Sequence, residues 1–414
     1  MFRSLEQPKG FAVDIDSFEK FILDDWIEIN QSVDCVFLTT NKKRADELSR
    51  CFRQTRIILL EDYEYYLSPN HSTHVRLLNA LGIKSCELAY LSCNYSFLER
   101  THAFLSGSIW ITEDVTYQQA SKLPDLVIEN MSQFKSDLIE GLSGFCGEMM
   151  VIPHFSFKSA IFLPVFFEVD GVDVPFYVLG RYYSSPHFNH QCHPYSIAIK
   201  NNKKFGSATY GVFNSVFVNI YSNVIKELKK AIQIDVVCSV PVKPNKDPRF
   251  DAILSGISTS CGVLNAGSSF TCIRDYPDQK NLKAEERAKN IQGAFQFCGS
   301  LDGKTVVLID DVCATGATIQ ECVRELKKHK AKQVIVLVLA INQFDSGYWS
   351  SDIPHLQCSV CGSTMVLRVN SKNREFFYSC PNYYRETSPT ISFKSGLSDL
   401  FEYEQTRLYS YFSF

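Results

Sequence analysis

The sequence of 414 residues lacks an excess of charge of either sign. It contains 42 Lys and Arg residues against 45 Asp and Glu residues, so its formal net charge at pH 7 is only −3. Proteins that bind nucleic acid or anionic membranes through their overall charge are strongly basic. At the level of the whole chain, the charge balance therefore supports neither class of protein.

Long hydrophobic runs are absent as well. The longest, Ala160–Phe167 (interrupted by Pro164) and Val334–Ile341, fall far short of the ~20 apolar residues that a membrane-spanning helix needs. The N-terminal stretch Met1–Asp16 has no uninterrupted apolar segment of the kind found in secretion signals. We therefore expect a soluble, cytoplasmic protein without a membrane partner.

The chain also lacks a disulfide framework, an internal repeat and a low-complexity tract. Its 15 cysteines occur at irregular spacings, and an odd number in a large chain without a secretion signal predicts reduced thiols. Most are expected to be small buried side chains. Only Cys358, Cys361 and Cys380 have a spacing that calls for another explanation.

Helical and strand-like segments alternate along most of the chain, which predicts a multidomain α/β protein. Residues 1–150 are expected to form a Rossmann-like domain, 151–186 a β-rich junction, 187–345 a second parallel-sheet domain, 355–392 a cysteine-bearing module and 393–414 an aromatic tail. The segments behind this division are the expected strands Val33–Thr40, Arg56–Leu60, Cys86–Ser92, Ser108–Thr112, Ala160–Val169, Val174–Leu179, Ile234–Pro241 and Val334–Ile341, and the expected helices Lys42–Phe52 and Phe205–Ala231.

The most informative stretch is Val306–Thr318. Its apolar residues Val306–Ile309 predict a buried inner strand of a parallel sheet, which ends at the acidic pair Asp310 and Asp311. A helix is expected from Ile319 to about Lys330. The turn between strand and helix therefore presents backbone N–H groups at a helix N-terminus, where phosphate is favoured.

The side chains of this turn fit a phosphorylated sugar. Gly316 has no Cβ to keep a ligand away from the backbone, and Thr315 and Thr318 add hydroxyl donors. The two acids, Asp310 and Asp311, are able to accept hydrogen bonds from the vicinal hydroxyls of the sugar. The alternative is an ordinary strand–loop–helix corner whose acids are merely solvated at the strand end.

This stretch resembles the motif with which type I phosphoribosyltransferases bind phosphoribosyl pyrophosphate (PRPP). The resemblance implies that Asp310 and Asp311 hold the ribose 2′- and 3′-hydroxyls. The residues implied to cradle the 5′-phosphate are Ala314, Thr315, Gly316, Ala317 and Thr318. Over roughly residues 190–342 the chain is similar to the ComF-type branch of this family. Four blocks carry that likeness: Ile199-Lys200, Ser239–Pro244, Arg249-Phe250, and Gln279–Leu282 with Glu286–Phe295.

The reaction of PRPP expels pyrophosphate from an oxocarbenium-like sugar, so positive charge and a water-excluding lid are expected around the leaving group. Lys243, Lys246 and Arg249 follow the expected strand that ends near Pro241, where a pyrophosphate-binding loop would lie. The polar segment Arg274–Asn290, with Lys280, Lys283 and Arg287, is the expected lid. The family motif places an Arg at position 287, and we expect Arg287, Asp310 and Asp311 to be catalytic. Lys243 is expected to contact PRPP. Mg²⁺ is expected to bind together with PRPP.

The resemblance has one departure, because Asp247–Asp251 stands where the family has a basic-Gly-Phe-Asn block. Two functions therefore stay open. The first is a PRPP-dependent phosphoribosyltransferase with an unknown acceptor base or nucleotide. The second is a non-catalytic PRPP or nucleotide sensor, or a regulatory protein associated with nucleic acid, in which the same pocket binds ligand without turnover.

The module at residues 355–392 begins with the knuckle Cys358-Ser-Val-Cys361-Gly362, which is able to share one Zn²⁺ between two thiolates. An expected hairpin, Met365–Val369 with Glu375–Cys380, returns Cys380 towards the knuckle. The stretch resembles the four-cysteine zinc ribbon of type I topoisomerases, except that Glu386 stands at the fourth position. The resemblance leaves open a zinc site of Cys358, Cys361, Cys380 and Glu386, or a degenerate ribbon held by aromatic packing. Such ribbons often contact single-stranded nucleic acid, for which Arg368, Lys372, Arg374, Tyr378 and Tyr383 would be suitable.

In the N-terminal domain, Asp14 and Asp16 follow a short apolar run. With Val36–Asn41, Glu87–Ser92 and Gly107–Thr112 they are faintly similar to haloacid-dehalogenase-like (HAD) phosphohydrolases. In those enzymes the first Asp is the nucleophile, the second is a general acid/base, and Mg²⁺ lies between acids. Ser92-Cys93-Asn94 stands where the later acidic pair is required. We therefore expect a HAD-like fold without phosphatase activity.

Overall fold

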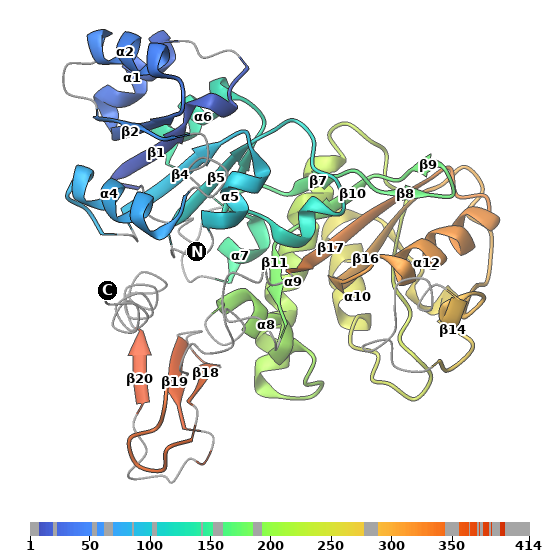
Figure 1. The fold of residues 1–414 in the computed structure, drawn as a ribbon. Helices are drawn as coiled ribbons and strands as arrows, with labels where there is room; N and C mark the ends of the chain where they lie inside the picture. Colours follow the sequence, from blue (N-terminus) through green and yellow to red (C-terminus); the bar gives the residue numbers. More distant parts are fainter. Residues whose placement is uncertain are drawn as a thin grey trace.

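The computed structural model describes residues 8–19, 23–51, 56–61, 69–84, 87–101, 106–141, 144–151, 160–184, 193–276, 289–343, 356–363, 365–370, 372, 376–380, 382 and 390–393. The described helices and strands include two large, mainly parallel sheets with helices packed on them, so the protein is α/β as expected (Figure 1). Among the described helices, none is long and apolar enough to cross a membrane.

The first sheet has six strands in the order β3-β2-β1-β4-β5-β6, and every pair in it is parallel. This order, which reverses direction between β1 and β4, is that of a doubly wound Rossmann sheet. The strands are β1 (Gly10–Asp14), β2 (Asp34–Thr39), β3 (Arg56–Leu59), β4 (Leu88–Ser92), β5 (Gly107–Ile111) and β6 (Leu126–Ile128).

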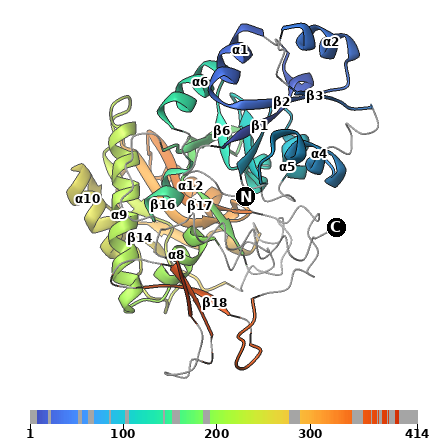
Figure 2. The same ribbon diagram turned by 90° about the vertical axis from the view of Figure 1, so that its left-hand side faces the viewer.

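Helices cover both faces of the first sheet (Figures 1 and 2). On one face α1 (Leu23–Ser32), α2 (Lys42–Cys51) and α6 (Met131–Glu140) bury Trp26, Leu48 and Phe134. On the other face α4 (His71–Leu81) and α5 (Tyr95–Thr101) bury Leu77 and Phe97. Because β1, β4 and β5 are buried along their whole length, they are apolar at nearly every position rather than at alternate ones.

The second sheet has seven strands, with β16 and β17 at its centre. Its order is β13-β12-β16-β17-β10-β7, and β11 also pairs with β17. Its strands are β7 (Leu163–Val165), β10 (Phe176–Val178), β11 (Arg181–Tyr183), β12 (Val236–Ser239), β13 (Leu264–Asn265), β16 (Thr305–Cys313) and β17 (Gln333–Gln343). Its pairs are parallel, except that β7 runs antiparallel to β10.

The two faces of the second sheet pack against different helices. α8 (Pro194–Asn202), α9 (Ala208–Leu228) and α10 (Asp251–Cys261) share one hydrophobic cluster with alternate residues of β16 and β17. α12 (Ala317–Lys328) lies on the opposite face. The hydrophobic cluster on that side continues into residues of the first sheet, among them Ala12, Val36 and Trp110, so the two sheets share one core.

The segment expected as a β-rich junction does more than connect two domains. Its residues between 160 and 184 form the hairpin β7–β10 and also extend the second sheet, because β10 and β11 both pair with β17. A smaller hairpin, β8 (Glu168–Val169) with β9 (Val172–Asp173), connects β7 to β10. The helix expected at Phe205–Ala231 is confirmed as α9, which begins after Ser207 caps its N-terminus, and the separate helix α8 precedes it.

The cysteine-bearing module contains an antiparallel sheet of three strands, β18 (Val366–Val369), β19 (Phe376–Ser379) and β20 (Thr390–Phe393). The expected hairpin is confirmed by the pairing of β18 with β19. This sheet lies next to α8 in both views (Figures 1 and 2), and Cys358, Met365 and Tyr378 belong to the same hydrophobic cluster as α8 and α9. The module is therefore packed on the second sheet's helices.

Candidate functional site

The acidic pair lies near the carboxyl end of the central strand β16, which continues past it to Cys313. β16 is flanked by two parallel strands, β12 and β17, so its carboxyl end lies at the edge of the sheet where ligands bind in open α/β folds. Gly316 has a positive φ of 75° and directly precedes α12, which begins at Ala317. The expected inner strand, tight turn and helix are therefore confirmed, with two differences in their bounds. The strand does not end at the acidic pair but runs on to Cys313, because its pairing with β17 continues there, and the helix begins two residues earlier than the sequence suggested.

Asp311 is held by two cations. Its Oδ2 accepts hydrogen bonds from Nη1 of Arg249 at 2.6 Å and forms an ion pair with Nζ of Lys203 at 2.8 Å, while Oδ1 accepts from the backbone N–H of Val312 at 2.8 Å. Although burial alone would raise the pKa of this carboxyl, Lys203 and Arg249 hold it far below the ordinary value of an aspartate. Asp311 is thus a permanent anion that orients two positive charges beside the strand end.

Asp310 has the opposite environment. Its Oδ1 accepts a hydrogen bond from the N–H of Asp311, and its carbonyl oxygen accepts one from the hydroxyl of Tyr221 at 2.6 Å. Burial, and then the adjacent negative charge of Asp311, raise the pKa of Asp310 to about 7. The side chain is half-buried, so of the two carboxyls Asp310 is the one with capacity left for a ligand hydroxyl.

Lys243, expected to contact the pyrophosphate of PRPP, follows β12 at the same edge of the sheet. Its Nζ donates to the carbonyl oxygen of Tyr276 at 2.5 Å, lies 4.4 Å from the centre of the Tyr276 ring and is 3.9 Å from a carboxylate oxygen of Asp275. Lys246 is exposed. The structure thus brings Lys243 to the first residues of the expected lid, while Lys280, Lys283 and Arg287 lie outside the described residues.

Three residues of this site were not among the expected ones. Lys203 lies just beyond α8, three positions after the Lys200 that the ComF likeness pointed to, and Tyr221 lies on α9. Tyr117 belongs to the first half of the chain, yet its hydroxyl reaches Cys313 and Ala314 in the turn after β16. No local sequence signal links Tyr117 to the turn, because the two are 196 positions apart or more.

The three cysteines of the C-terminal module converge as expected. Their sulfur atoms all lie within 4.8 Å of one another, and Sγ of Cys361 is 3.3 Å from Sγ of Cys380. The knuckle is closed by hydrogen bonds from the N–H of Cys358 to the carbonyl oxygen of Ser363 and from the N–H of Gly362 to that of Cys358, both 2.8 Å. Glu386, the expected fourth ligand, lies outside the described residues.

The acids at the end of β1 are engaged by neighbouring side chains. Asp14 is fully buried and accepts a hydrogen bond from Oγ of Ser92 at 2.7 Å. Asp16 accepts from Oγ1 of Thr39 at 2.6 Å and from both the N–H and Oγ1 of Thr40 at 2.6 Å and 2.9 Å. Together these bonds tie the ends of β1, β2 and β4 to one another.

Comparison with known proteins places one family on this site. The family described as phosphoribosyl transferase domain matches residues 270–352, which include β16, the turn and α12. Ribose-phosphate pyrophosphokinase of Marinomonas sp. (strain MWYL1) is 29% identical over 79 residues, which are 19% of this chain and 25% of that protein. Transcriptional regulator GfcR of Methanocaldococcus jannaschii is 28% identical over 104 residues, 24% of this chain and 48% of that protein. The matches thus span from a quarter to about half of these curated relatives.

Solved structures with similarity to this chain include purine phosphoribosyltransferase from Pyrococcus horikoshii Ot3, at 20% identity and a TM-score of 0.23, covering 32% of this chain and 76% of that one. The match to phosphoribosylpyrophosphate synthetase from Mycobacterium smegmatis covers 81% of this chain and 82% of that one, at 11% identity and a TM-score of 0.21. The family match itself encloses the acidic pair and the glycine turn. Residues 270–352 of the chain are therefore similar to the phosphoribosyl transferase domain.

Proposed function

We propose that the protein is a PRPP-dependent phosphoribosyltransferase, which transfers the phosphoribosyl group to an acceptor and releases pyrophosphate. The observation that carries this proposal is the arrangement at the end of β16. There a carboxyl with spare hydrogen-bonding capacity, Asp310, adjoins a glycine turn that opens a helix of 12 residues. The carboxyl of Asp310 suits the hydroxyls of a sugar, and the glycine turn at the N-terminus of α12 suits its phosphate.

In this proposal the backbone N–H groups and hydroxyls from Ala314 to Thr318 hold the 5′-phosphate at the N-terminus of α12. Asp310 accepts hydrogen bonds from the ribose hydroxyls. Asp311 contributes indirectly, because it fixes Lys203 and Arg249 beside the sugar. These residues and Lys243 stabilise the negative charge that develops on the pyrophosphate as its bond to the ribose carbon breaks. Mg²⁺ would arrive with PRPP and offset part of the negative charge of its diphosphate, and Asp310 is suited to contact it.

The ComF-type subfamily is part of this proposal. It is supported by the order of the four sequence blocks and by two contacts of their residues: Arg249 contacts Asp311, and Lys243 lies beside Asp275. Arg287 keeps its proposed catalytic role from the resemblance alone. The acceptor is left open, since no described side chain near Asp310 discriminates one base from another.

A second candidate function is a PRPP or nucleotide sensor that binds without turnover. It is favoured by the engagement of Arg249, because the ion pair of its guanidinium with Asp311 offsets part of the positive charge that the pyrophosphate would otherwise meet. The altered block Asp247–Asp251 points the same way. In both functions the loop binds the same ligand, so the two differ in whether pyrophosphate is released.

The proposed function is tested by two measurements made in sequence. Calorimetric titration with Mg-PRPP should give a saturable binding isotherm, and the variant Asp310→Asn should lose preference for PRPP over a 2′,3′-dideoxy analogue. A screen for pyrophosphate release over nucleobases and nucleotides then separates enzyme from sensor. Absence of PRPP binding by the wild-type protein would refute the transferase, and absence of binding to nucleoside 5′-monophosphates as well would refute the sensor.

For the C-terminal module we propose a zinc site of Cys358, Cys361 and Cys380, completed by Glu386 or a water. For the N-terminal domain we propose that Asp14 and Asp16 have no catalytic role. The mutual approach of three sulfur atoms supports the zinc site, since thiolates so placed fit one tetrahedral ion. The engagement of Asp14 by Ser92 and of Asp16 by Thr39 and Thr40 supports a structural role for these acids. Contact with single-stranded nucleic acid, for which Arg368 and Lys372 are exposed, is a further part of the proposal.

A further inference from the structure

The turn that follows β16 is contacted by the N-terminal half of the chain. Tyr117 lies between β5 and β6, and its hydroxyl is 3.0 Å from Sγ of Cys313 and donates to the carbonyl oxygen of Ala314 at 3.2 Å. A Cβ placed on Gly316 would lie 3.3 Å from the Tyr117 hydroxyl oxygen and 2.9 Å from the ring of Phe167. The outer side of the turn is therefore packed against two aromatic side chains.

The segment Val115–Asp125, which carries Tyr117, is fixed first by its backbone. The N–H of Tyr117 donates to the carbonyl oxygen of Phe166 at 3.2 Å, and the N–H of Phe166 donates to that of Val115 at 2.8 Å. The Tyr117 ring then packs on Phe167 and Phe176, with ring centres 5.2 Å and 5.8 Å away. These contacts hold the phenol of Tyr117 against the turn.

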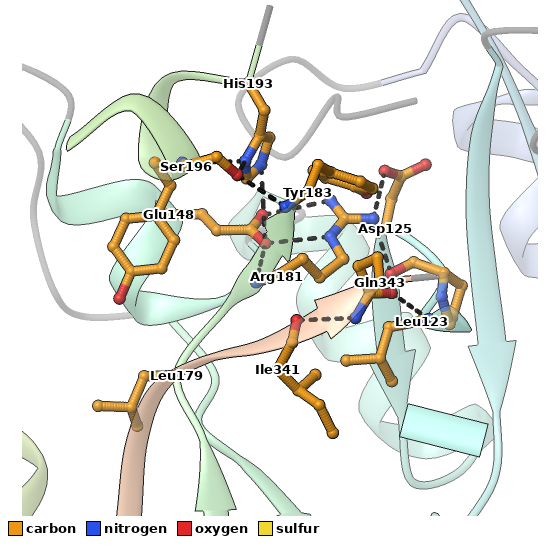
Figure 3. Close-up of polar contacts among 12 residues, drawn as sticks. Leu123, Asp125, Glu148, Leu179, Arg181, Tyr183, His193, Ser196, Ile341 and Gln343 are labelled. Atoms are coloured by element: carbon orange, nitrogen blue, oxygen red, sulfur yellow. Dashed lines mark hydrogen bonds and ion pairs between the residues drawn. The ribbon is translucent and has the colours of Figure 1, made fainter. Parts of the chain in front are cut away.

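A second fixation comes from Gln343, at the end of β17. Its Oε1 accepts a hydrogen bond from the N–H of Leu123 at 2.7 Å (Figure 3). Its Nε2 donates to the carbonyl oxygen of Ala120 at 3.0 Å. Gln343 is buried, so both bonds are shielded from competing water. The side-chain amide thus attaches the segment to the strand next to β16.

A third fixation is the buried ion network around Arg181 of β11. Its Nη1 donates to Oδ1 of Asp125 and to the carbonyl oxygen of Pro124, both at 3.0 Å, while its Nε and Nη2 bind the two carboxylate oxygens of Glu148 at 3.0 Å and 3.2 Å. Figure 3 shows the guanidinium between the two acids, beside Gln343. All three charged side chains are buried, which makes this attachment specific in geometry.

We propose that Tyr117 is a positioning residue for the phosphate-binding turn, so that the N-terminal half of the chain completes the PRPP site. This inference rests on the proposed function. In a trans peptide unit the C=O and the N–H point in opposite directions. When Tyr117 holds the carbonyl group of Ala314, it also sets the direction of the N–H of Thr315. That N–H group is one of the donors that the 5′-phosphate requires, so the phenol prepares the turn for its ligand before binding.

The test compares three ligands on the full-length variant Tyr117→Phe, which keeps the ring packing and removes the hydroxyl. Calorimetric titration is performed with ribose 5-phosphate, Mg-PRPP and inorganic pyrophosphate. We expect the dissociation constants of ribose 5-phosphate and Mg-PRPP to rise by the same factor, about fivefold to tenfold, which is the usual effect of one lost hydrogen bond. The affinity for pyrophosphate, which does not use the turn, should be unchanged.

The matched control is Tyr90→Phe. Tyr90 is also in the N-terminal half, and its hydroxyl lies 2.7 Å from Nδ1 of His74 on α4, outside the segment that carries Tyr117. This control should bind all three ligands as the wild type does.

Wild-type affinities in Tyr117→Phe for ribose 5-phosphate and Mg-PRPP would overturn the inference. Equal weakening of all three ligands, together with a lower unfolding temperature, would also overturn it, since that result indicates general damage. If the wild-type protein bound neither ribose 5-phosphate nor Mg-PRPP, the proposed function would fail and this inference with it.

Discussion

At the scale of single residues, the contrast between Asp310 and Asp311 has a measurable consequence. The raised pKa of Asp310 means that the folded protein keeps a proton on this carboxyl over a pH range in which the unfolded chain has lost it. Between about pH 4 and 7 the folded state therefore binds more protons, and the contribution of Asp310 to stability falls as the pH rises. Asp311, whose pKa is lowered, stays ionised throughout that range.

The variant Asp310→Asn removes this loss of stability at higher pH. Its unfolding temperature should exceed that of the wild type by roughly 2 °C or more at pH 8, with the difference shrinking towards pH 5. Differential scanning calorimetry across this range measures the effect. Asp302→Asn, which alters an exposed acid, is the control and should show no trend with pH. A difference that is constant with pH would contradict the raised pKa.

The hydroxyls of the turn give a second prediction at this scale. Thr315→Ala and Thr318→Ala should each weaken PRPP binding by about 1–3 kcal/mol, because a hydrogen bond to a charged phosphate is lost. Isothermal titration measures the change. Thr259→Ala, whose hydroxyl bonds to the carbonyl oxygen of Ser255 on the surface of α10, is the matched control. If both variants bound as the control does, the turn would not be the phosphate site.

At the scale of elements, the cysteine-bearing module predicts a defined metal content. Protein purified without chelator should carry about one zinc per chain, with Zn–S distances near ~2.3 Å by X-ray absorption. Cys361→Ser should lose the metal, because three thiolates leave no ligand to spare. Cys298→Ser, which changes an exposed cysteine outside the module, should retain it. Metal analysis that finds no zinc in the wild type would leave a ribbon held by packing alone.

Elements with a strong local signal could be predicted from the sequence, and others could not. The β16–α12 corner was foreseen because an apolar run, two acids and a glycine turn follow one another within Val306–Thr318. α9 was foreseen as well, since the expected helix Phe205–Ala231 encloses it and Ser207 is a favourable N-cap at its start. The placement of β10 and β11 beside β17 depends on pairing across more than 150 positions, which local patterns do not encode.

The same distinction applies to the candidate site. Asp310, Asp311 and Gly316 belong to one motif and were identified together. Lys203 reaches Asp311 only because α8 ends beside β16, and Tyr117 reaches the turn only because the two sheets share a core. The convergence of Cys380 on Cys361 was predictable, since a hairpin brings together residues on either side of a short turn.

At the scale of the whole molecule, the attachment of the first sheet to the second should dominate stability. Arg181→Met leaves Asp125 and Glu148 buried without their cation, and it should lower the free energy of unfolding by about 3–5 kcal/mol. Arg324→Met is the matched control. It also removes an Arg bound to two acids, Asp170 and Glu321, but Arg324 is partly exposed and should cost only about 0–1 kcal/mol. Denaturant unfolding followed by tryptophan fluorescence measures both, and equal losses would contradict the role of the buried network.

The amide of Gln343 also has a consequence for the order in which the chain becomes structured during synthesis. Its partner Ala120 precedes it by 223 positions, whereas Asp125 precedes Arg181 by 56. The first sheet is thus synthesised long before the strand that finally anchors it. Contacts between distant positions form slowly because a long loop must first be closed. The segment that carries Tyr117 would therefore reach its final position only after β17 has been synthesised. The contact of Tyr117 with the phosphate-binding turn would then form among the last steps of folding.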